Sequence, residues 1–166
     1  MKLEDLPDGA SIFGDANILI YHFSGTSLAC QGFLQRCESR QIDAFTGVHI
    51  VLEVTHRLMM LEALQKGLIT GGQPARKLKE QPEIVKMLQA YNQSVQQISR
   101  LNIRVRAITS TAVRASEAIR VQEGLMTNDS VTVALMRQLD LPVIATADAD
   151  FNNVSGLRVY QPEDIS

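Results

Sequence analysis

The 166-residue sequence has no tryptophan, only two cysteines and no long apolar run. A helix that crosses a bilayer needs about 18 or more apolar residues, so the sequence predicts no transmembrane segment. The first residues, Met1 to Pro7, are polar and acidic, and we expect no signal peptide there. Cys30 and Cys37 lie seven apart in a stretch of helical periodicity, which favours two buried thiols in a reducing compartment over a disulfide. We therefore expect a soluble, cytoplasmic protein.

An excess of charge of one sign is also lacking, because the formal net charge is only −2. No overall basic field attracts nucleic acid, so a nucleic-acid partner would need a local basic patch. The composition, 45% hydrophobic and 20% charged, is that of an ordinary globular protein, and the length indicates one domain over residues 1–166. The candidate basic residues, each of which also fits a plain solvated surface position, are Arg57, Lys66, Arg76, Lys77 and Lys79.

Short apolar runs alternate with longer stretches of helical periodicity along the chain. We expect strands at residues 10–14, 42–46, 103–108, 141–145 and 157–160, and helices at 27–39, 48–66, 82–98, 109–121 and 129–139. Residues 17–21 fit a strand extension or a helix equally well, and residues 67–81 resemble an exposed connector. Strands that alternate with helices pair in parallel through right-handed crossovers. The sequence therefore predicts an α/β fold, a three-layer α/β/α sandwich around a parallel sheet.

Helix caps follow from hydroxyl and amide side chains at the predicted helix starts. Ser27 is expected to cap the helix at 27–39, and Thr109 or Ser110 the helix at 109–121. Asn128 or Thr127 is the expected cap of the helix at 129–139.

Four acidic residues are placed to converge. Asp15 and Asp148 each follow a predicted strand directly, and Asp129 lies in the first turn of a helix. Glu53 lies about two turns into the helix that follows the second strand. Ligands of open α/β sheets bind at the carboxyl ends of the strands. We therefore expect the four carboxylates to meet above one edge of the sheet.

Such a cluster of carboxylates needs a cation. Two ionised carboxylates about 4 Å apart repel by roughly 4 kcal/mol at an effective dielectric near 20. An all-oxygen site is typical of Mg²⁺ or Mn²⁺ rather than zinc. An ion held there activates water and stabilises charge on a phosphate, which indicates phosphodiester hydrolysis.

Each acid also has an ordinary structural explanation, and residue spacing alone does not decide between the two. These explanations are a helix cap for Asp15, a first-turn acid favoured by the helix dipole for Asp129, turn formers for Asp148 and Asp150, and a surface ion pair with Arg57 for Glu53.

Four motifs occur in a fixed order along the chain. They are Ile12-Phe-Gly-Asp-Ala-Asn-Ile-Leu-Ile-Tyr21, Val51-Leu-Glu-Val-Thr55, Thr127-Asn-Asp-Ser130 and Ala145-Thr-Ala-Asp-Ala-Asp-Phe151. In order and spacing they resemble the motifs of PIN-domain nucleases, above all the bacterial VapC-type toxins. The resemblance extends to Leu157-Arg-Val-Tyr-Gln-Pro162 and so covers nearly the whole chain.

The resemblance implies a five-stranded parallel sheet, a short helix at residues 16–23 and a ribonuclease that depends on Mg²⁺ or Mn²⁺. It also implies RNA as the substrate and, for a VapC-type toxin, a small antitoxin protein as partner. The acidic quartet of the family matches Asp15, Glu53, Asp129 and Asp148. Asn17 and Thr146 match polar positions that support the site, and Asp150 shares the metal-binding role of Asp148 or stands next to it.

An apolar stretch in the helix at 48–66 gives a further expectation. Met59, Met60 and Leu61, with Leu64 and Leu68, fit either core packing or a surface that docks a partner segment or a second copy of the chain. We expect a homodimer.

Three other functions compete with the nuclease. His49, Glu53 and His56 fall at i, i+4 and i+7 on one helical face, which fits a zinc enzyme. A phosphatase of the haloacid-dehalogenase type also places an aspartate after its first strand, but it usually carries Asp-x-Asp where this chain has Asp15-Ala-Asn17. A PIN-like module that binds RNA or serves as a scaffold without catalysis would not bind the metal.

Overall fold

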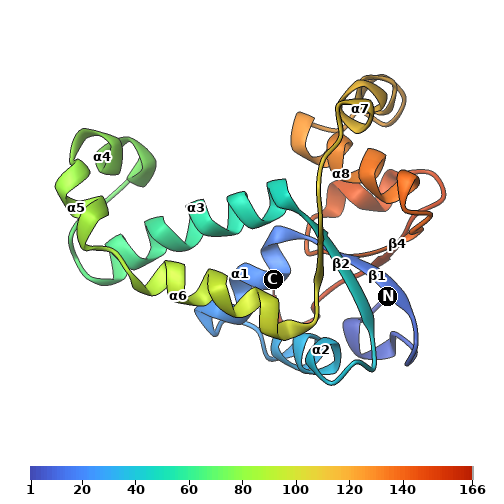
Figure 1. The fold of residues 1–166 in the computed structure, drawn as a ribbon, viewed down its shortest axis with the longest axis horizontal. Helices are drawn as coiled ribbons and strands as arrows, with labels where there is room; N and C mark the ends of the chain where they lie inside the picture. Colours follow the sequence, from blue (N-terminus) through green and yellow to red (C-terminus); the bar gives the residue numbers. More distant parts are fainter. Residues whose placement is uncertain (166) are drawn as a thin grey trace.

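A computed structural model describes residues 1–165 and contains one parallel sheet of five strands (Figure 1). The spatial order is β3-β2-β1-β4-β5. Their bounds are β1 (Ser11–Gly14), β2 (Asp43–Gly47), β3 (Arg104–Arg106), β4 (Val143–Ala145) and β5 (Arg158–Tyr160). The chain proceeds outward from β1 to β3 and then returns to β4 on the other side of β1. The carboxyl ends of β1 and β4 therefore form the switch point at which α/β proteins place their ligands.

Eight α-helices and three short 3₁₀ helices connect and cover the strands within the described residues. The α-helices are α1 (Ala16–Ser24), α2 (Leu28–Glu38), α3 (Val48–Gln65), α4 (Pro74–Glu80), α5 (Pro82–Met87), α6 (Ala90–Gln97), α7 (Ser110–Glu123) and α8 (Thr127–Gln138). The 3₁₀ helices are η1 (Leu3–Asp5), η2 (Ile98–Leu101) and η3 (Ala149–Asn153). Helices α7 and α8 pack on each other across the sheet from α1 and α2, which confirms the predicted α/β sandwich (Figure 1).

The main hydrophobic core lies between the sheet and its helices. Its largest fully buried side chains include Phe13, Phe151 and Ile144. Cys30 and Cys37 are free and buried in the same core, as predicted. Burial raises the pKa of the two thiols to about 11 and about 12, so both stay protonated and unreactive. No helix among the described residues is long and apolar enough to cross a membrane.

A second, smaller core lies where α3 extends away from the sheet together with α4, α5 and α6 (Figure 1). Met60 is buried in this core, and Met59 and Leu68 pack against it. Leu61 packs on the main core, whereas Leu64 is 37% exposed. Most of the methionine-rich stretch therefore serves core packing, one of the two uses expected for it.

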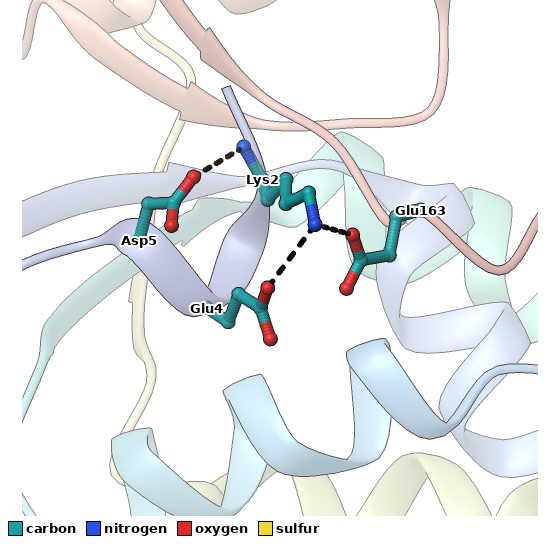
Figure 2. A network of polar contacts seen from close by, with 4 residues as sticks. All are labelled: Lys2, Glu4, Asp5 and Glu163. Carbon is teal, nitrogen blue, oxygen red and sulfur yellow. Dashed lines mark hydrogen bonds and ion pairs between the residues drawn. The ribbon is translucent and has the colours of Figure 1, made fainter.

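Residues 1–5 lie beside residues 159–163 at the edge of the sheet. Lys2 forms a parallel bridge with Gln161, next to β5. Its ammonium pairs with Glu163 at 2.5 Å and with Glu4 at 3.3 Å, and its backbone N–H donates to the Asp5 carboxylate (Figure 2). These exposed contacts fix the position of η1 beside the last strand, although each surface pair stabilises the fold only slightly.

The local predictions hold at three helix starts. Residues 16–24 form α1, as the family resemblance implied, and not an extension of the strand. Ser27 caps α2 by accepting from the Cys30 N–H, and Thr109 caps α7 by accepting from the Ala112 N–H. The predicted cap of α8 is wrong: the helix begins at Thr127, and its N-cap residue Met126 makes no side-chain cap bond.

Two predictions about residues 67–98 are also wrong. Residues 67–81 are more than an exposed connector, because they contain α4 and bury Leu78 in the second core. The expected helix at 82–98 is divided into α5 and α6 between Leu88 and Gln89. The carboxylate of Glu62 accepts hydrogen bonds from the Gln89 and Tyr91 N–H groups there, which starts a new helix.

Candidate metal centre

Asp15 lies where β1 ends and α1 begins. Its Oδ1 accepts a 2.7 Å hydrogen bond from the Ala16 N–H, so it caps α1 as one interpretation of the sequence expected. Its backbone N–H donates to the Ala145 carbonyl of β4, which continues the sheet ladder to the switch point. The side chain is only 8% exposed. This acid is therefore fixed in position by the ends of two neighbouring strands.

Thr146 and Asn17 connect Asp15 to the loop after β4. The Thr146 hydroxyl donates to Asp15 Oδ2 at 2.6 Å, and Asn17 Nδ2 donates to the same oxygen at 2.7 Å. Asn17 Oδ1 accepts from the Ala147 N–H, and Thr146 Oγ1 accepts from the Asp148 N–H. One buried hydroxyl thus contacts both acids that follow the central strands. These contacts fit the supporting roles that the resemblance gave to Asn17 and Thr146.

A cleft of about 440 Å³ opens at this edge of the sheet. All four predicted acids line it: Asp15 directly follows β1, Glu53 lies on α3, Asp129 lies in α8 and Asp148 lies in the loop after β4. The structure therefore brings together residues that lie up to 133 positions apart in the sequence. They are not dispersed over the surface, as four independent structural roles would allow.

Three carboxylates approach most closely. Oxygens of Asp129, Asp148 and Asp150 all lie within 4.8 Å of one another, close enough for one ion to bind them. Among the described residues, no other group of three metal-binding side chains meets this criterion, so Asp15 and Glu53 line the cleft at a greater distance. Asp148 also caps η3, with Oδ1 accepting from the Asp150 N–H. The turn role expected for these two residues therefore coexists with their place in the group.

The acids disfavour one another's ionisation. Burial, reinforced by the charges of Asp148, Asp15, Glu53 and Asp150, raises the pKa of Asp129 to about 6. Burial also raises the pKa of Asp15; the hydrogen bonds from Thr146 and Ala16 oppose this rise, and the charges of Glu53 and Asp148 add to it. Within residues 1–165 none of these acids forms an ion pair with a lysine or arginine. Carboxylate oxygens that form no ion pair with the chain are the donor set that a hard divalent cation fits.

Comparison with models of known protein families shows which family the chain belongs to. The model of the PIN domain family matches residues 12–157. The chain belongs to the PIN domain family. The matched region of this PIN domain contains all four acids of the cleft, together with Asn17, Thr146 and Asp150.

Solved structures with the same fold include two toxin–antitoxin systems. One is VapBC2 from Rickettsia felis bound to a DNA fragment from their promoter, with a TM-score of 0.57, 11% identity and coverage of 92% of this chain and 99% of that chain. Another is a toxin–antitoxin complex from Klebsiella pneumoniae, with a TM-score of 0.54, 19% identity and coverage of 89% and 95%. At these identities the similarity establishes the fold. No curated protein matches the sequence significantly.

The competing hydrolases find little support in this PIN domain. His49 Nε2 lies 2.8 Å from the Thr132 hydroxyl, and the ring covers Gly47, where an added Cβ would lie 2.4 Å from it. Among the described residues, His49, Glu53 and His56 do not form a metal-binding group. Asn17, at the second position of Asp-x-Asp, is used in hydrogen bonds to the loop after β4. No described lysine lines the cleft, as the haloacid-dehalogenase chemistry would require.

The candidate basic residues differ in what they contact, and Lys79 is exposed, forms no ion pair within the described residues and does not line the cleft. Lys66 pairs with Glu62, Arg76 pairs with Glu80, and the Lys77 ammonium donates to the Thr70 carbonyl. Arg57 instead lines the cleft, and it is the one arginine or lysine among the described residues that does so. The expected surface pair of Glu53 with Arg57 is not formed. Both side chains therefore face the cleft without being tied to each other.

The apolar half of the cleft was predicted only in part, because Met60, Leu61 and Leu64 belong to the stretch for which a docking surface was one of two expected uses. Its lining residues are Ile20, Tyr21, Met60, Leu61, Leu64 and Pro74. Apolar residues at helical spacing look the same in a sequence whether they face a core or a cleft. Only the packing of α1, α3 and α4 against one another distinguishes the two.

Proposed function

We propose that this PIN domain is a ribonuclease that depends on Mg²⁺ or Mn²⁺ and hydrolyses internal RNA phosphodiesters. The observation that carries the proposal is the convergence of Asp15, Glu53, Asp129 and Asp148 in one cleft, where within the described residues none of them pairs with a lysine or arginine. Membership of the PIN family and the all-oxygen donor set both support it.

Asp129, Asp148 and Asp150 would hold the ion at their point of closest approach, with Asp15 completing the site from β1. Glu53, which lines the cleft from α3, would bind the ion through water or take a proton from the attacking water. When bound, the ion supplies a nucleophilic water and neutralises charge on the phosphate. Thr146 and Asn17 keep Asp15 Oδ2 in a fixed orientation by two hydrogen bonds, which is the positioning that outer partners of metal ligands provide.

The direct test is cleavage of an end-labelled RNA of mixed sequence by the purified protein in Mg²⁺, Mn²⁺, Zn²⁺ or EDTA. We expect cleavage in Mg²⁺ or Mn²⁺ and none in EDTA, and we expect Asp15→Asn and Asp129→Asn to abolish it while both variants stay folded. Full activity in either variant would reject the site. Glu117→Gln, which removes an exposed carboxylate on α7, is the matched control.

Isothermal titration with Mn²⁺ separates the enzyme from a non-catalytic module. We expect binding that Asp148→Asn removes. A folded protein that binds RNA but takes up neither Mn²⁺ nor Mg²⁺ would instead be a scaffold with an idle site.

We also propose a small antitoxin protein as partner and a homodimer as the assembled form. The support for the antitoxin is that the two structural neighbours are described as toxin–antitoxin systems. The homodimer remains a prediction from the sequence. Expression of the wild-type chain is then expected to arrest bacterial growth, whereas Asp129→Asn is tolerated. Rescue by a small reading frame next to the gene would establish the pair, and light scattering after gel filtration would measure the oligomer.

A further inference from the structure

Helix α3 separates two grooves that share part of its surface. The first is the acidic cleft between α3 and α1. The second groove extends along another face of α3, from Asn128 at the start of α8 to Ala75 in α4. Glu53, Arg57 and Met60 line both grooves, so they form the ridge between them. A chain that lies over the acids can therefore continue into the second groove beside Arg57.

The second groove has the chemistry that unstacked bases need. His49, Leu52 and His56 line it at i, i+3 and i+7 of α3, and Leu52 is 64% exposed. Imidazole and guanidinium planes and apolar side chains stack on bases, while exposed amides such as Asn128 hydrogen-bond to base edges. Leu52 is the one large apolar side chain among the lining residues that is mostly exposed, and the exposed Ala75 adds only a methyl group, which is little apolar surface for docking a protein.

Charge also favours a nucleic acid. Arg57 forms no ion pair within the described residues, and no other lysine or arginine described lines either groove. A guanidinium that forms no ion pair with the chain attracts a phosphate. From His49 to Met60 the groove follows α3 for about 16 Å at 1.5 Å per residue, the length of a few stacked nucleotides at about 3.4 Å each.

We propose that the second groove binds the nucleotides next to the scissile phosphate of a single-stranded RNA. Arg57 on the ridge contacts a backbone phosphate, and Leu52 and His56 contact the adjacent bases. This inference rests on the proposed ribonuclease function and adds the residues that hold the substrate beside the reacting bond.

The test compares Leu52→Ala, His56→Ala and Arg57→Ala with two controls on α7. The controls are Val121→Ala, an exposed apolar truncation, and Arg114→Ala, an exposed arginine truncation. Fluorescence anisotropy with a labelled 12-residue RNA in EDTA measures binding without cleavage. We expect Leu52→Ala and His56→Ala each to weaken binding about tenfold, the effect of one lost stacking partner. We expect Arg57→Ala to weaken it as much and to reduce its salt dependence, while the controls bind as the wild type does.

Abasic substrates locate the contact. After the cleaved bond has been mapped in Mg²⁺, the base on each side of it is removed in turn. We expect the wild type to bind one of the abasic RNAs as weakly as Leu52→Ala binds the intact RNA. Leu52→Ala should bind that abasic RNA no more weakly than the wild type does. Additive losses would overturn the assignment of that base to the groove.

The two proposals fail in different ways. If the wild type binds RNA but cleaves none in Mg²⁺ or Mn²⁺, the ribonuclease proposal fails, and the anisotropy series still decides the role of the groove. If the three groove variants bind RNA within twofold of the α7 controls, the groove proposal is overturned, and the groove is left to a protein partner.

Discussion

The hydroxyl of Thr146 donates a 2.6 Å hydrogen bond to Oδ2 of Asp15, across 131 residues of sequence. It also accepts the Asp148 N–H at 3.0 Å, so this one buried side chain couples the two acids that follow the central strands. Its contact lowers the pKa of Asp15 against the rise that burial causes. Thr146 is therefore expected to matter for metal affinity although it is not itself an acid.

Replacement of Thr146 by valine tests this coupling. Valine keeps the volume but removes one of the two hydrogen bonds to Asp15 Oδ2 and leaves the Asp148 N–H without the Thr146 hydroxyl as acceptor. We expect the protein to lose about 1–3 kcal/mol of stability in urea and to bind Mn²⁺ about 10- to 100-fold more weakly. Thr146→Ser retains the hydroxyl and is expected to keep most of the affinity. Equal Mn²⁺ binding by the valine variant and the wild type would show that Asp15 needs no such support.

Asp129 gives a prediction about pH. Its pKa of about 6 in the folded chain lies above its ordinary value of 3.8. The folded state therefore binds more protons than the unfolded state between these values, so the metal-free protein loses stability as the pH rises from about 4 to 6. Asp129→Asn removes the repelled charge, and we expect it to stabilise the metal-free protein by about 1–3 kcal/mol at pH 7 and hardly at all below pH 4.

Urea melts in EDTA at several pH values measure this difference. The matched control is Glu117→Gln, which removes an exposed carboxylate from α7 and is expected to leave the pH profile unchanged. A stability gain for Asp129→Asn that is the same at pH 4 and pH 7 would contradict electrostatic repulsion as its cause.

Divalent ions are expected to offset the loss of stability that repulsion among the carboxylates of the cleft causes. A ligand that binds only the folded state stabilises it by about 2.7 kcal/mol at a hundredfold excess over its Kd. We therefore expect Mn²⁺ or Mg²⁺ to raise the melting temperature of the wild type, and EDTA to return it to the starting value. In Asp148→Asn, which removes one of the three closest carboxylates, the shift should be largely lost. An undiminished shift in that variant would place the ion elsewhere.

The sequence predicted most of the strands and helices that position the acids, but few of the residues that surround the acids in the cleft. Asp15 and Asp148 were found because an acid that directly follows a buried strand has a fixed place in a parallel sheet. The distance of Glu53 from the group formed by Asp129, Asp148 and Asp150 depends on how α3 is tilted, which the sequence pattern does not determine.

The break between α5 and α6 was missed for a different reason. Ile84, Leu88, Tyr91, Val95 and Ile98 keep a helical period across it. The cause of the break is Glu62, more than 25 residues earlier, whose carboxylate accepts the Gln89 and Tyr91 N–H groups. The residues of the interrupted segment keep their helical spacing, so their sequence alone does not show that a distant carboxylate breaks the helix.

Glu62 is therefore expected to stabilise the extension of α3 with α4, α5 and α6. Burial opposes its ionisation, but hydrogen bonds from Lys66 and from the Tyr91 and Gln89 N–H groups outweigh burial and lower its pKa to about 2. A carboxyl whose folded pKa lies below its ordinary value of 4.5 contributes stability above pH 4.5, and this contribution is lost as the pH falls toward 2.

We expect Glu62→Gln to cost about 1.5–3 kcal/mol at pH 7 and to speed amide exchange in α6 more than in the sheet. Glu80→Gln, which breaks the exposed pair with Arg76, should cost less than about 1 kcal/mol. Equal losses in the two variants, or uniform exchange in Glu62→Gln, would show that the buried carboxylate does not hold the start of α6.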